Sequence, residues 1–168
     1  MFNLDDNNNL IDHTADNVLG CSTLTDTGCS SQNYDYMEYM GGVEYDPVHN
    51  RLFVTDLYDY QRVLVFDLSN GITNGMDASY VIGQPDFSSY GSNTTINGFA
   101  ESDYGGLAYD GTADRLYVLD TYNNHRVMVF DVSPANIHNG MDASYVIGAT
   151  NFTSVGAGGC AANEIPSS

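Results

Sequence analysis

The stretch that decides the fold is GGVEYDPVHNRLFVTDLYDYQRVLVFDLS, residues 41–69. It recurs as GGLAYDGTADRLYVLDTYNNHRVMVFDVS at residues 105–133, an offset of 64, with 15 of 29 positions identical. After one inserted residue the match continues, because residues 72–87 and 137–152 share 12 of 16 positions. A repeat this long and this close indicates two copies of one structural unit.

Within each copy, apolar and polar residues alternate over short runs that end at turn-forming residues such as Asp46-Pro47. This pattern predicts β-strands, and no stretch has the period of an amphipathic helix. The predicted strands are 42–46, 51–56, 62–68 and 78–83 in the first copy, and 106–110, 115–120, 126–132 and 143–148 in the second. Four short antiparallel strands make one blade of a β-propeller, so we expect an all-β chain built from such blades.

The flanking segments fit the same plan. Val18-Leu19-Gly20 repeats the pattern of Val81-Ile82-Gly83. We therefore expect a partial blade (its third and fourth strands) at 1–20, full blades at 41–83 and 105–148, and connectors at 21–40, 84–104 and 149–168. Because a propeller needs about four to eight blades to close, we expect more chain, or other subunits, to complete the ring.

The charge of the chain is strongly negative. It has 22 acidic residues, four arginines and no lysine, for a formal net charge of -18. Such a surface repels nucleic acids and anionic membranes, and no apolar run approaches the roughly 20 residues that cross a bilayer. All four arginines recur in the repeat, Arg51 with Arg115 and Arg62 with Arg126, which indicates a structural role.

The segment RLYVLDTYNNHRVMVFD, residues 115–131, resembles the signature of the NHL-repeat β-propellers. The signature residues here are Asp120, Asn123, His125, Arg126 and Val127. The connector phrase YVIGQPDF, residues 80–87, is similar to that of bacterial members with long repeats of about 64 residues. The resemblance implies a six-bladed propeller. The first copy departs from the signature, because Gln61 stands where the second has His125.

Two recurring acid–base pairs are the best-defined candidate site. Asp56 ends a predicted strand and Arg62 begins the next, as Asp120 and Arg126 do in the second copy. Such pairs bind an anionic ligand or clamp the turn between the strands. Recurrence in both copies favours a structural clamp, because a single active site seldom repeats in every blade.

The cysteines and glycosylation motifs favour an extracellular or cell-surface protein. Cys21 and Cys29 bracket a short polar loop that suits a local disulfide, although two free thiols are the alternative. Cys160 then remains as a free thiol, or pairs with another chain or another segment. Asn93 and Asn151 begin Asn-X-Thr glycosylation motifs.

Metal and enzyme chemistry find little support. Residues 5–16 form an oxygen-rich acidic run, but its spacing lacks the glycine and terminal glutamate of a calcium loop. Some enzymes of the NHL class, peptide-amidating lyases among them, hold a metal with several histidines, and no histidine position repeats here. We expect no catalytic residue and no cofactor, with calcium at the acidic run as the alternative.

The function predicted from these patterns is a non-catalytic extracellular scaffold that works through protein–protein contacts and assembles into a filament. Its expected partners are copies of itself or other blades of a longer chain. The alternative is a propeller that binds a glycan or peptide, and an NHL-type lyase ranks third. The residues assigned to an interface or to packing are the connector tyrosines Tyr34, Tyr36, Tyr39 and Tyr90.

Overall fold

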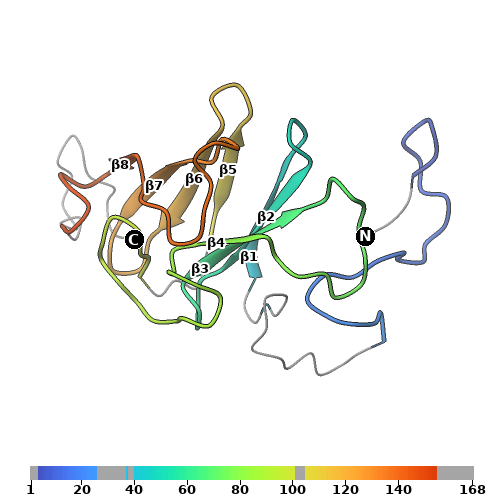
Figure 1. The fold of residues 1–168 in the computed structure, drawn as a ribbon, viewed down its shortest axis with the longest axis horizontal. Coiled ribbons are helices and arrows are strands. Elements are labelled where there is room, and N and C mark those ends of the chain that lie inside the picture. The colour runs from blue at the N-terminus through green and yellow to red at the C-terminus, as the bar shows by residue number, and fades with distance from the viewer. Residues whose placement is uncertain (1–3, 26–36, 38–39, 101–104, 155–168) are drawn as a thin grey trace.

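The computed structural model describes residues 4–25, 37, 40–100 and 105–154, and in these residues every regular element is a strand. The first sheet contains β1 (Met40–Asp46), β2 (Arg51–Asp56), β3 (Arg62–Asp67) and β4 (Tyr80–Ile82). The second contains β5 (Leu107–Asp110), β6 (Arg115–Asp120), β7 (Arg126–Asp131) and β8 (Tyr145–Ile147). Both sheets are antiparallel meanders with strands in sequence order, and they lie side by side (Figure 1). The all-β prediction is confirmed, and the sheets have the form of propeller blades, here named blade 1 (β1–β4) and blade 2 (β5–β8).

Equivalent turns in the two blades use the same backbone conformation. The β1–β2 and β5–β6 turns place Asn50 and Asp114 at φ values of 53° and 50°. The turns before β3 and β7 place Gln61 and His125 at 46° and 47°. Asn, Asp and His tolerate this left-handed region better than most side chains do. His125 of the sequence signature is therefore a turn residue.

The outermost strands are shorter than predicted. β4 and β8 have three residues each, whereas six were expected at 78–83 and 143–148. Gly83 and Gly148 end them with φ values of 94° and 90°, a conformation that does not continue a strand.

The main core lies between the two blades. Because side chains alternate across a strand, Phe53 on β2 faces blade 2, whereas Val54 faces the other side of blade 1. Phe53 and Val65 of blade 1 share the core between the blades with Met128 and Phe130 of blade 2, all fully or almost fully buried. A second cluster on the far side of blade 1 includes Leu64, Phe66 and Val81, with Leu19 packed against it.

The N-terminal segment differs from the prediction. Strands were expected within 1–20, but the described part, 4–20, forms only an isolated bridge between Leu4 and Leu10. No strand of the described residues lies beside this segment, so its backbone N–H and C=O groups have no neighbouring strand to pair with. The segment instead runs along the far side of blade 1, where Asn74 Oδ1 accepts a hydrogen bond from the Val18 amide at 3.0 Å.

Candidate functional site

The predicted Asp–Arg pairs form in both blades. Asp56 ends β2 directly opposite Arg62 at the start of β3, and Asp120 faces Arg126 in the same register. The Nε–Oδ2 distances are 3.1 Å in blade 1 and 2.7 Å in blade 2, and all four side chains are buried. The turn between the strands is therefore closed by a buried ion pair.

The arginines of these pairs also hold the connectors. Arg62 Nη1 donates to the Phe87 carbonyl at 2.8 Å, and Arg126 Nη1 donates to the equivalent Phe152 carbonyl. Arg126 Nη2 donates to the carbonyls of Thr95 and Gly98 at 3.1 and 3.0 Å. In blade 2 the guanidinium thus joins the connector that precedes the blade to the one that follows it.

The partner carboxylate in blade 2 is fully engaged as well. Asp120 Oδ1 accepts the Ala100 amide at 2.8 Å, and Oδ2 accepts Asn124 Nδ2 at 2.8 Å. Burial raises the pKa of Asp120, against hydrogen bonds from Asn124 and Arg126 that lower it. Both oxygens of this carboxylate thus accept hydrogen bonds from protein groups, three in all with the one from Arg126 Nε, which is the arrangement of a structural group.

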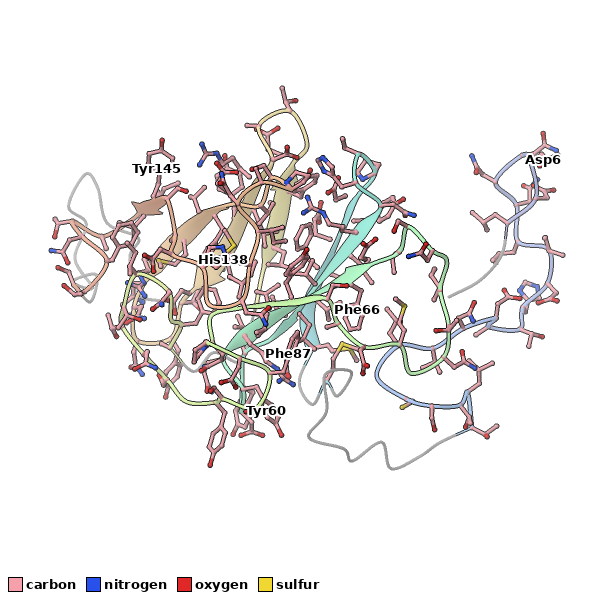
Figure 2. The ribbon with its side chains drawn as sticks, viewed as in Figure 1. Asp6, Tyr60, Phe66, Phe87, His138 and Tyr145 are labelled. Atoms are coloured by element: carbon pink, nitrogen blue, oxygen red, sulfur yellow. The ribbon has the colours of Figure 1, made fainter. Side chains whose placement is uncertain are left out.

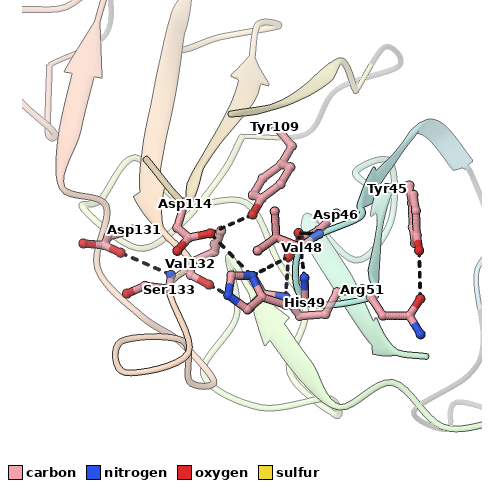
Figure 3. A network of polar contacts seen from close by, with 11 residues as sticks. Tyr45, Asp46, Val48, His49, Arg51, Tyr109, Asp114, Asp131, Val132 and Ser133 are labelled. Carbon is pink, nitrogen blue, oxygen red and sulfur yellow. Dashed lines mark hydrogen bonds and ion pairs between the residues drawn. The ribbon is translucent and has the colours of Figure 1, made fainter. Parts of the chain in front are cut away.

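A second polar cluster joins the two blades at the β1–β2 and β5–β6 hairpins (Figure 3). Arg51 binds Asp46 Oδ2 through Nε at 2.8 Å and Nη2 at 2.7 Å, and its Nη1 crosses to the Val132 carbonyl of blade 2 at 2.7 Å. His49 Nδ1 lies 3.0 Å from Asp46 Oδ2 and 3.4 Å from Asp114 Oδ1. We call the Arg51–Val132 contact, with its Asp46 support, the hairpin joint.

The hairpin joint was not predicted from the sequence. Arg51 was matched with Arg115 across the repeat, but Asp46 was taken only as a turn residue and His49 was given no role in the site. A signal was available, because Asp46 and its counterpart Asp110 both precede a recurring arginine by five positions.

The joint shifts the ionisation of two side chains. Burial alone raises the pKa of Asp46, but hydrogen bonds from Arg51, His49, Tyr109 and Val48 outweigh it and bring the pKa from 3.8 to about 2. Burial, together with hydrogen bonding to Asp114 and Asp46, raises the pKa of Tyr109. Asp46 is therefore a stable anion at neutral pH.

The lowered pKa of Asp46 predicts an acid-dependent loss of stability. A carboxyl with a depressed folded pKa stabilises the fold above its unfolded pKa of 3.8, and this contribution is lost as pH falls through the folded value of about 2. Asp46→Asn is expected to lower the free energy of unfolding by at least about 2 kcal/mol at pH 6. The difference from the wild type should shrink from pH 4 to pH 2 in urea titrations. A difference that stays constant over that range would rule out the linkage.

Several predicted residues lie apart from these clusters. Asn93 and Asn151 are exposed, and Asn151 Oδ1 accepts hydrogen bonds from the amide and hydroxyl of Thr153. Tyr90 is 74% exposed and meets Tyr60 edge-on at 6.4 Å. Cys21 is half-buried beside Gly75. Five predicted residues lie outside the described ones: Cys29, Tyr34, Tyr36, Tyr39 and Cys160. The Cys21–Cys29 pairing therefore stays a prediction.

The acidic N-terminal run forms local turns. Asp5 Oδ1 accepts the amides of Asn7 and Asn9, both at 2.9 Å, and these bonds, Asn9 first, lower the pKa of Asp5. Within the described residues, no three His, Cys, Asp or Glu side chains lie close enough to hold a metal ion. The same part of the chain contains no helix that is long and apolar enough to span a membrane.

Part of the second repeat matches a known family of protein repeats. Residues 105–130, which run from just before β5 almost to the end of β7, match the family model of the NHL repeat. A search of curated proteins gave no match. The match agrees with the NHL-repeat resemblance seen in the sequence, and the two four-stranded sheets have the form of β-propeller blades. The NHL repeat indicates a β-propeller module for protein interaction.

Proposed function

We propose that this chain is a non-catalytic scaffold of the extracellular space, which works through protein–protein contacts and assembles into filaments. The observation that carries the proposal is the hairpin joint, in which the buried Arg51 guanidinium bonds the backbone of the neighbouring blade. Arg62 and Arg126 likewise donate hydrogen bonds to carboxylates and to connector carbonyls. Charged groups that an active site would use are here committed to holding blades together.

Other features support a place outside the cell. Both glycosylation motifs present an exposed asparagine, Asn93 and Asn151. Cys21 and Cys29 are eight positions apart, which suits a disulfide in an oxidising compartment. The net charge of -18 keeps such a protein soluble until its surfaces are covered by a partner.

The test of the scaffold is negative-stain electron microscopy of the unreduced protein over a range of concentrations. We expect linear particles whose repeat distance corresponds to two blades. Closed rings or single particles at every concentration would overturn the filament, and rings would direct attention to the central channel of the propeller.

A further inference from the structure

Blade 2 exposes part of the face that blade 1 buries, mainly along its outermost strand β8. We call this the trailing face, the side of a blade that points toward the next one along the chain. In blade 1 its members Phe53, Val63 and Ile82 are completely buried against blade 2. In blade 2 the equivalent of Ile82 is Ile147, which is 52% exposed. Tyr145, on the same strand, is 59% exposed and lies on the outer side of the molecule, far from Asp6 of the N-terminal segment (Figure 2).

An unused hydrogen-bond donor lies on the same side of blade 2. Arg115 is the counterpart of Arg51, whose Nη1 binds the Val132 carbonyl of the following blade. Nη1 of Arg115 is enclosed and, among the described residues, has no hydrogen-bond partner. The guanidinium lies 5.2 Å from the ring centre of Tyr145, a side chain of the trailing face that is 59% exposed. A buried donor without an acceptor destabilises the structure, so this position favours a partner that brings a carbonyl.

The complementary surface lies on the far side of blade 1. We call it the leading face, the side that points toward a preceding blade. In blade 2 the leading face, with Leu116 and Val118, packs against blade 1. In blade 1 the equivalent residues Leu52 and Val54 line an open apolar hollow of about 440 Å³ together with Leu19, Met37, Met40, Gly41, Gly42 and Val43.

The N-terminal segment occupies part of the leading face as a strand of a preceding blade would. Between the blades, Asn139 Oδ1 accepts the Val81 amide at 3.0 Å, and the Gly140 amide donates to the Val81 carbonyl at 3.0 Å. Asn74 and Gly75, the counterparts of Asn139 and Gly140, make the same two contacts with Val18, at 3.0 and 3.3 Å. Val18 therefore takes the place of Val81. Among the described residues, no such partner binds Val146, the equivalent on β8.

From these observations we propose that the trailing face of blade 2 docks on the leading face of blade 1 in a second copy of this chain. The contact repeats the one between the two blades of a single chain. The Arg115 guanidinium then faces the Leu68 carbonyl of the second copy, the counterpart of Val132. In its own chain this carbonyl accepts Asn50 Nδ2 at 2.8 Å and the Gly71 amide at 3.0 Å, so the guanidinium has to replace one of these donors. β8 replaces residues 17–19 of that copy, which act as a removable plug. This head-to-tail contact rests on the proposed self-assembly and gives it a specific interface.

The plug and the net charge both oppose docking. Two copies carrying -18 each repel one another, and salt screens this repulsion over a distance of about 10 Å at 0.1 M. Association is therefore expected to strengthen as ionic strength rises, because the faces that meet are mainly apolar.

The experiment is sedimentation velocity of the full chain and of three variants. Each is measured at about 0.05 and about 0.5 M NaCl, below and above the ionic strength at which the screening length is about 10 Å. Ile147→Asp places a carboxylate on the exposed trailing face and should weaken self-association at least about tenfold. Arg115→Leu removes the donor and should weaken it about tenfold. Leu19→Asp loosens the plug, which leaves the leading face when the second copy docks, and should strengthen association about tenfold.

The matched control is Asn123→Asp, which adds the same charge at an exposed turn position. Its counterpart in blade 1, Asp59, is an exposed aspartate. Circular dichroism confirms folding of each variant. Assembly that none of the three variants changes would overturn this interface and leave the scaffold standing. A wild-type chain that stays monomeric at both salt concentrations would overturn the interface and the proposed self-assembly together.

Discussion

Arg126→Met is expected to lower the free energy of unfolding by about 3–5 kcal/mol. The substitution keeps an unbranched side chain of similar length but leaves the carboxylate of Asp120 buried without its counter-ion. It also removes the donors that bind the carbonyls of Thr95, Gly98 and Phe152, so two connectors lose their anchor at once.

The measurement is urea denaturation followed by circular dichroism, with Arg115→Met as the matched control. Arg115 is one of the same four arginines, but it is only half-buried, and its Nη1 has no hydrogen-bond partner in the part of the chain that the structure describes. In dilute solution, Arg115→Met should lower the free energy of unfolding by less than about 1 kcal/mol. Equal losses for the two variants would show that the clamp contributes nothing specific.

Gly42→Ala should lower the free energy of unfolding by about 3 kcal/mol, which is near the upper end of the usual penalty for overpacking. A Cβ at Gly42 would lie 2.4 Å from the Gly105 carbonyl oxygen, which is backbone and does not yield without moving blade 2. The innermost strands β1 and β5 touch at this point. The substitution therefore forces the two blades apart where they are closest.

Its control is Gly106→Ala, the equivalent position in blade 2. There the added carbon would meet Leu119 Cδ1 at 3.0 Å, the far end of a flexible and 40% exposed side chain. That side chain can move aside, so a loss below about 1 kcal/mol is expected. The measurement is thermal unfolding of both variants, and Gly42→Ala should have the lower melting temperature. Similar melting temperatures would contradict the close approach of the blades.

The parts that could be predicted were those encoded within one repeat. Alternation around Phe53 and Val54 predicted β2, and the recurrence of Asp56 with Arg62 predicted an ion pair, because register places these two residues opposite each other. Such features depend on neighbouring strands only, so their pattern is local.

The parts that escaped prediction depend on how two units meet. The bond from Arg51 to Val132 spans 81 positions, and its acceptor is a main-chain carbonyl, which leaves no trace in side-chain identity. The same holds for the carbonyls of Thr95 and Gly98, which lie in a connector without a periodic pattern. The N-terminal segment resembles a fourth strand in sequence, but no strand that it could pair with lies among the described residues, so it forms no ladder there.

The hairpin joint has a direction, with the donor on the earlier blade and the acceptor on the later one. One repeat therefore carries both halves of its own connection. Tandem duplication of such a unit creates a working junction at once, since the new copy arrives with a guanidinium for its successor and a carbonyl for its predecessor. A gene encoding this architecture can lengthen or shorten by whole units without inventing a new contact, which makes the number of blades, rather than their sequence, the variable that changes most easily.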